Sequence, residues 1–178
     1  MKYVLLFTVV AAVLILSGCM DLFGPSPQTL AEALKTNTKA LIDKMISGGT
    51  PSYDELLKVL YVRDSDKNDS DIKTQVMAFP LGLALSFGAA GTPTKIEVAG
   101  VVETKFWPVN ITDKPSFIDK VYSVTYVVTT TDSTKTSVTL PMVTVTGKDT
   151  GYFYTLYIKT TGSSTSVEFY PEPVELVF

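Results

Sequence analysis

The stretch Asp64 to Gln75, DSDKNDSDIKTQ, is rich in side chains that could bind a metal ion. Asp64, Asp66 and Asn68 stand at alternate positions, so a tight loop could turn their three side-chain oxygens toward one centre. Carboxylate and amide oxygens are the ligands that calcium takes in proteins. One function predicted for this stretch is therefore a calcium site that stabilises the domain.

The spacing of these oxygens resembles positions 1, 3 and 5 of the calcium loop of EF-hand proteins. The stretch departs from that loop at position 6, where Asp69 replaces a glycine, and at position 12, where Gln75 replaces a bidentate glutamate. Asp71 stands in place of the apolar residue at position 8, and Arg63 and Lys67 dilute the negative charge. The alternative is a solvated acidic loop between two structural elements.

Composition excludes most catalytic chemistry. The chain has no histidine and one cysteine, which excludes Ser-His-Asp and Cys-His catalysis and imidazole metal sites. It also lacks the Gly-x-Ser-x-Gly, P-loop and Gly-x-Gly-x-x-Gly motifs. Of two carboxylate pairs, Asp54–Glu55 belongs to a predicted helix N-terminus, where acids stabilise the helix, and Glu172–Glu175 lies among prolines. We therefore expect no enzyme activity, no catalytic residues and no cofactor beyond the candidate calcium.

The single cysteine, Cys19, follows an apolar run at the N-terminus. After Met1 and Lys2, the fourteen residues 3–16 (YVLLFTVVAAVLIL) carry no charge. Because a spanning helix takes about 20 apolar residues, this run is too short to cross a bilayer comfortably. Its length and its basic start are typical of a secretory signal. The sequence therefore predicts a signal peptide rather than a core helix.

The residues Leu16-Ser17-Gly18-Cys19 resemble the lipobox of bacterial lipoproteins. The resemblance implies that the chain is cut between Gly18 and Cys19, that the Cys19 thiol takes a diacylglycerol, and that the new amine is acylated. Two or more acyl chains give a stable anchor, whereas one holds a protein weakly. Membrane lipid is therefore a predicted partner, reached through Cys19 on the extracytoplasmic side.

The type of membrane depends on the source. If the source has two membranes, Met20 after the cysteine resembles the pattern sent to the outer membrane, on its periplasmic face. If it has one, the anchor lies in the outer leaflet of the cell membrane.

Three segments follow from the cleavage site. Residues 1–18 form the removed signal peptide, residues 19–26 the lipidated cysteine and a short tether, and residues 27–178 a single domain. Cleavage removes one lysine and no acid, so the mature formal charge is −4. Without a basic run the domain is not expected to bind nucleic acid. With no second cysteine it cannot form an internal disulfide.

The first half of the domain has a helical pattern. Pro27 with Ser26 as N-cap predicts a helix that ends at Gly48–Gly49. Ser52 and Glu55 have capping-box spacing at the start of a second helix. The predicted stripe of the first helix comprises Leu30, Leu34, Leu41 and Met45, joined by Ala33 and Asn37.

The next segments are less regular. Residues 63–71 predict a polar loop, and residues 72–79 fit either a strand or a helix. Residues 80–87 predict a short buried helix, with Pro80 at its first position and Gly88 closing it.

Beyond residue 94 the composition favours strands. They are predicted at 94–106, 117–130, 137–146, 152–160 and 167–170, with a last pairing at 174–178. Pro141 places its strand at an edge or a bulge, because proline cannot donate to the ladder. Helices followed by strands indicate an α+β domain, with the N-terminal helices packed on a curved antiparallel meander. This element order resembles the NTF2-like and cystatin-like folds.

Tyrosines are the other candidate site residues. Tyr122 and Tyr126 share one face of a predicted strand, and Tyr152 and Tyr154 share a face of another. Tyrosine has an apolar body and a polar tip, which suits a pocket lining or a binding surface. The alternative is ordinary sheet core, since strands favour aromatic residues.

The sequence thus predicts a membrane-anchored envelope lipoprotein whose domain is a non-catalytic binding or scaffolding module. One alternative is a carrier of a small apolar ligand in a pocket between helix and sheet. The other is a domain stabilised by calcium at residues 64–75.

Overall fold

The computed structural model describes residues 24–88, 91–104, 116–153, 156–161, 164–169 and 172–173. Helical elements come first: α2 (Pro27–Ile46), α3 (Tyr53–Leu56), a 3-10 turn (Asp64–Asp66) and α4 (Ser70–Gly88). The strands follow: β1 (Pro93–Glu103), β2 (Ile118–Thr130), β3 (Lys135–Val145), β4 (Gly151–Phe153), β5 (Leu156–Thr161), β6 (Ser164–Phe169) and β7 (Glu172–Pro173).

The strands form two antiparallel sheets, one in the order β1-β2-β3-β4 and one in the order β5-β6-β7. Helices that precede strands connected as a meander confirm the predicted α+β class. None of the helices in the described ranges is long and apolar enough to cross a membrane.

The helix starts follow the sequence closely. The Ser26 side chain accepts the Thr29 backbone N–H at 3.2 Å, and Pro27 occupies the first turn of α2. Gly48 has a φ of 81°, which ends the helix in the left-handed region. Ser52 and Glu55 form the predicted capping box of α3.

The course of α4 differs from the prediction. Residues 70–88 form one continuous helix, and Pro80 lies inside it rather than at its start. In a regular helix the N–H of residue 80 would bond to the carbonyl of Val76, and proline has no N–H to give. The helix continues through Pro80 because it is apolar on several sides, and packing stabilises it in place of the missing bond.

The main sheet confirms the predicted faces of β2. Tyr122, Val124, Tyr126 and Val128 are buried, whereas the residues between them are half-buried. Among the described strands, Pro141 of β3 pairs with β2 alone, because β4 pairs just with residues 142–144. The predicted edge position of this proline is therefore confirmed locally.

The predicted strand at residues 152–160 is instead two strands. β4 ends at Phe153 in the main sheet, and β5 begins at Leu156 in the second sheet. The chain therefore changes sheets in the middle of a sequence with continuous strand propensity. Tyr152 lies in β4, whereas Tyr154 lies outside the described residues, so their predicted shared face stays a prediction.

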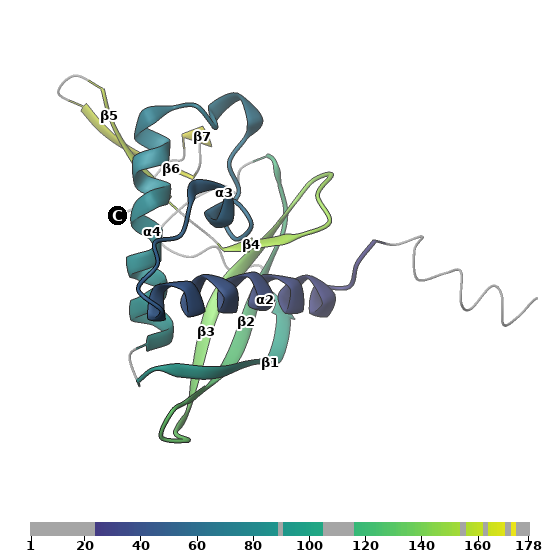
Figure 1. The fold of residues 1–178 in the computed structure, drawn as a ribbon. Coiled ribbons are helices and arrows are strands. Elements are labelled where there is room, and N and C mark those ends of the chain that lie inside the picture. The colour runs from purple at the N-terminus through teal and green to yellow at the C-terminus, as the bar shows by residue number, and fades with distance from the viewer. Residues whose placement is uncertain are drawn as a thin grey trace, which may run out of the picture.

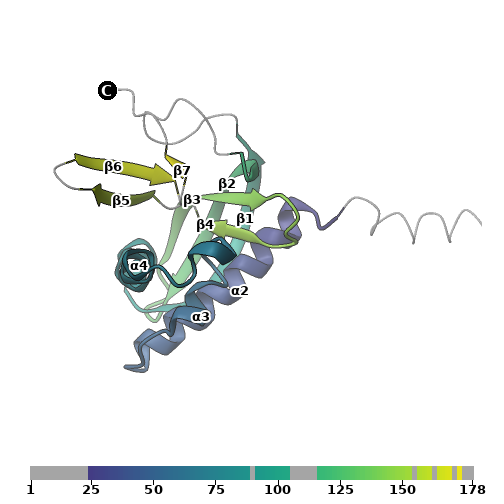
Figure 2. The same cartoon turned by 90° about the horizontal axis from the view of Figure 1, so that it is seen from above.

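Figures 1 and 2 show α2 crossing one face of the main sheet, with α4 standing beside it and β5 near α4. The buried face of α2 is rotated slightly from the predicted one, since Ala33 is exposed and Ala31 is buried. The core between helices and sheet comprises chiefly Leu30, Leu34, Leu41, Ile42, Leu56, Val76, Leu83, Phe87, Val124, Tyr126 and Val128.

Candidate functional site

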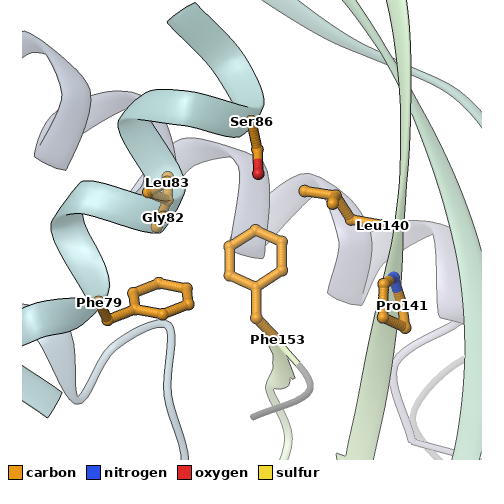
Figure 3. Close-up of a pocket in the computed structure, with 7 residues that line it drawn as sticks. All are labelled: Phe79, Gly82, Leu83, Ser86, Leu140, Pro141 and Phe153. Atoms are coloured by element: carbon orange, nitrogen blue, oxygen red, sulfur yellow. The ribbon is translucent and has the colours of Figure 1, made fainter. Parts of the chain in front are cut away.

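An apolar cleft lies between α4 and the main sheet, with a volume of about 210 Å³. Figure 3 shows the side chains that line it, four from α4 and three from β3 and β4. They are Phe79, Gly82, Leu83, Ser86, Leu140, Pro141 and Phe153.

The helix wall of the cleft follows from spacing on α4. The four lining residues of α4 follow one another at steps of three, one and three positions, which places them on one face of the helix. They are Phe79, Gly82, Leu83 and Ser86. Leu83 is buried and Phe79 is half-buried. A Cβ atom placed on Gly82 would meet no heavy atom within 4 Å, so this glycine leaves open space at the wall of the cleft.

The sheet wall lies where β3 has no second neighbour among the described strands. β4 pairs only with residues 142–144, so no described strand covers β3 beside Leu140 and Pro141. Phe153, the last residue of β4, closes one side, and its ring centroid lies 6.0 Å from that of Phe79. The backbone N–H of Phe153 donates to the carbonyl of Val59 at 2.9 Å, which holds the end of β4 in place.

The lining suits an uncharged group. It contains no titratable side chain, and the Ser86 hydroxyl is its single polar side-chain group among the described residues. A cavity of roughly 150 Å³ lined by aliphatic and aromatic side chains is enough to bind benzene. The cleft can therefore take a ring system or a short acyl segment, with one hydroxyl to orient it.

The predicted tyrosines lie elsewhere. Tyr122 and Tyr126 are buried in the sheet core, and the ring of Tyr126 packs edge-on against Phe87 at 5.6 Å between centroids. The Tyr126 hydroxyl is buried without a hydrogen-bond partner in the described ranges, and burial raises its pKa. Tyr152 is half-buried and packs edge-on against Tyr61 at 5.5 Å. Tyr154 lies outside the described residues.

Sequence reasoning did not single out the cleft residues, although a signal was present. Residues 76–90 (VMAFPLGLALSFGAA) contain no charge over fifteen positions. Such a run on a helix indicates more apolar surface than one core face requires. The contribution of β3 and β4 carries no comparable signal, since it depends on where β4 stops.

Each of the three residues predicted to bind calcium instead contacts a lysine or arginine side chain. The carboxylate of Asp64 pairs with Lys67 at 2.6 Å, Asp66 accepts from Arg63 at 2.9 Å, and the Asn68 side chain accepts from Lys73 at 3.5 Å. The hydrogen bond from Lys67 lowers the pKa of Asp64.

Within the part of the chain that the structure describes, no group of three or more acidic, histidine or cysteine side chains is placed to hold a metal ion. Calcium would have to displace two ion pairs and one hydrogen bond, so the geometry favours the solvated loop. The calcium site itself stays a prediction.

The carboxylate pair at residues 54–55 has a structural role. Glu55 accepts hydrogen bonds from Lys44 Nζ at 2.7 Å and from the Ser52 backbone N–H at 2.6 Å, which lower its pKa to about 2. Glu172 lies in β7, whereas Glu175 lies outside the described residues, as do the predicted cleavage and lipidation residues Gly18 and Cys19.

No protein-family model, no curated protein and no solved structure matches this chain. The lipobox and the NTF2-like or cystatin-like resemblance therefore stay predictions, and function has to be inferred from the residues of the chain itself.

Proposed function

We propose that this chain is a lipid-anchored, non-catalytic binding module of the bacterial cell envelope, and that its domain holds a small apolar ligand in the cleft between α4 and the main sheet. The observation that carries the proposal is the cleft itself, which is about 210 Å³ in volume and whose described lining residues carry no charge. Apolar pockets with few polar groups are the usual form of small-molecule sites.

The lipobox supports the location of this module. The tether from Cys19 to Pro27 spans eight residues, so it reaches roughly 30 Å when fully extended. The domain would therefore stay within about one domain diameter of the bilayer, which is also a source of apolar molecules.

The cleft can be tested by filling it. Gly82→Leu places a side chain in the open space beside the cleft, and leucine is the better helix former by roughly 0.6–1 kcal/mol. We expect the wild-type chain to bind indole in saturation-transfer NMR, and the Gly82→Leu variant to bind it at least tenfold more weakly without loss of thermal stability.

Gly88→Leu is the matched control, because Gly88 also lies in α4 with open space at its Cβ but does not line this cleft. This variant should bind indole as the wild type does. Equal binding by both variants, or no binding by the wild type, would contradict the ligand site.

A further inference from the structure

A second apolar feature of α4 faces solvent. Met77, Leu81, Ala84 and Gly88 are spaced by four, three and four residues, so they form one face of the helix, here named the α4 stripe. All four are exposed, and Met77 and Leu81 retain 40% and 69% of their accessible surface. The outer face of a surface helix normally carries polar side chains, so the α4 stripe indicates a surface that another molecule covers.

The α4 stripe runs into a groove of about 340 Å³ between the C-terminal ends of α2 and α4. One wall comes from α2 and comprises Ile42, Met45 and Ile46, and the other comes from α4 and comprises Ala84, Phe87 and Gly88. Residues 91–93 complete the described lining. Ile46 at the rim is 52% exposed. No charged side chain of the described residues lines this groove, and it shares Ala84 and Gly88 with the stripe.

The α4 stripe and the groove together form one apolar patch, and this patch is complementary to itself. Leu81 projects from α4 about one turn before the groove begins at Ala84, so the patch carries both a protruding side chain and a recess of apolar lining. A twofold interface requires this arrangement, because the same surface has to supply both halves of the contact. In such an interface Leu81 of each copy contacts Gly88 of the other. The twofold axis then passes midway between these two positions of α4, close to Ala84.

The distribution of charge also favours a second copy of the chain as the molecule that covers this patch. The chain is acidic, with a formal charge of −3, yet residues 76–94 contain no charged side chain. Two copies that met through a charged face would bring like charges together, which opposes association. The α4 stripe and its groove can meet their own image without that repulsion.

We propose that two copies of this chain associate through the α4 stripe, with Leu81 of each copy seated in the groove of the other. This inference rests on the groove at the C-terminal end of α4 and does not depend on the ligand cleft or on the lipid anchor.

Cysteine crosslinking in the full chain tests the interface. Ala84→Cys places a thiol next to the expected twofold axis, and oxidation in intact cells should give a crosslinked dimer on a denaturing gel. The parent chain, with Cys19 alone, is the blank. Val102→Cys is the matched control, because Val102 is 66% exposed on β1 and lies outside the groove. We expect at least tenfold more dimer from Ala84→Cys than from Val102→Cys.

Two further substitutions, each combined with Ala84→Cys, identify the contact. Leu81→Ala removes the protruding side chain, and Gly88→Leu fills the groove at a position whose Cβ would meet no atom within 4 Å. Each should reduce the crosslinked dimer at least fivefold, whereas Gly82→Leu, which fills the other cleft, should leave it unchanged. Circular dichroism melts confirm that the variants fold.

Other occupants of the α4 stripe give other results. A bilayer would protect the thiol introduced by Ala84→Cys from a water-soluble maleimide until detergent is added, without a dimer. A different protein would give a crosslink of another mass, and a segment of the same chain would protect the introduced thiol in the purified monomer. Any of these outcomes, or a dimer that persists when Gly88→Leu is present, overturns association through a second copy.

Discussion

Glu55 joins the start of α3 to the end of α2. Its carboxylate accepts hydrogen bonds from Lys44 Nζ, from the Ser52 backbone N–H and from the Ser52 hydroxyl, at 2.7, 2.6 and 2.9 Å. These bonds favour the charged form, with Lys44 the largest contribution, and lower the pKa from its ordinary value of 4.5 to about 2. A single side chain thus links helix capping to the packing of two helices.

The lowered pKa has a consequence for stability. Since the folded-state pKa lies below the unfolded one, Glu55 contributes stability that is fully present above about pH 4.5 and is lost as the pH falls toward 2. We expect Glu55→Gln to be less stable than the wild type at pH 7, with the difference shrinking through this window. Urea unfolding at a series of pH values measures it.

Asp54→Asn is the control for Glu55→Gln. It removes a neighbouring exposed carboxylate but leaves the capping box and the Lys44 contact intact. If the two variants altered the pH dependence of stability equally, the assignment of this effect to the Glu55 hydrogen bonds would be wrong.

At the scale of the elements, α4 is the helix whose course depends most on its surroundings. Pro80 leaves the carbonyl of Val76 without its helical partner, and an interior proline costs a helix roughly 3 kcal/mol. Alanine restores the N–H. It also makes the unfolded chain more flexible, which offsets about 0.4–1 kcal/mol of the gain in stability. We therefore expect Pro80→Ala to raise the free energy of unfolding by about 2–2.6 kcal/mol, as measured by urea titration.

Pro141→Ala is the control for this substitution. Pro141 lies in a strand, so alanine restores no helical hydrogen bond there, and a fall of no more than about 1 kcal/mol is expected from the more flexible unfolded chain. If Pro80→Ala gave no gain, Pro80 would behave as the first residue of a separate helix, as the sequence predicts for residues 80–87.

The element boundaries show what sequence patterns can and cannot predict. The starts of α2 and α3 were predictable, because Ser26 and Ser52 accept local hydrogen bonds that depend on neighbouring residues alone. The continuity of α4 through Pro80 was not, since tertiary packing overrides a local penalty. Nor was the break after Phe153, where strand propensity continues but the pairing partner changes from β3 to β6.

At the scale of the whole molecule, the cleft joins a helix to strands more than fifty residues away in sequence. The uncharged run at residues 76–90 predicts that α4 needs apolar contacts on more than one side. Which side remains open depends on where β4 ends beside β3, and that is a long-range property. The predicted tyrosines became core because alternation in β2 places Tyr122 and Tyr126 on its buried face.

The predicted lipid anchor would determine how the domain meets its surroundings. If acylated Cys19 is the membrane attachment, the folded domain contributes little to it, because two or more acyl chains are enough for a stable anchor. We expect the wild-type chain to stay in the membrane fraction after a high-salt wash. A Cys19→Ser chain, exported behind a signal that is cleaved without a lipobox, should appear in the soluble fraction.

The released Cys19→Ser domain should melt at the same temperature as the parent chain, because the predicted acylation site lies eight residues before α2 begins. Met20→Ser keeps the four lipobox residues and should remain membrane-bound, which separates loss of the thiol from a general effect of substitution near the cleavage site. A Cys19→Ser domain that still resisted high salt would show that the attachment is not the acyl chain. The exposed α4 stripe would then be the first surface to test, since charge-free apolar contacts are not weakened by salt.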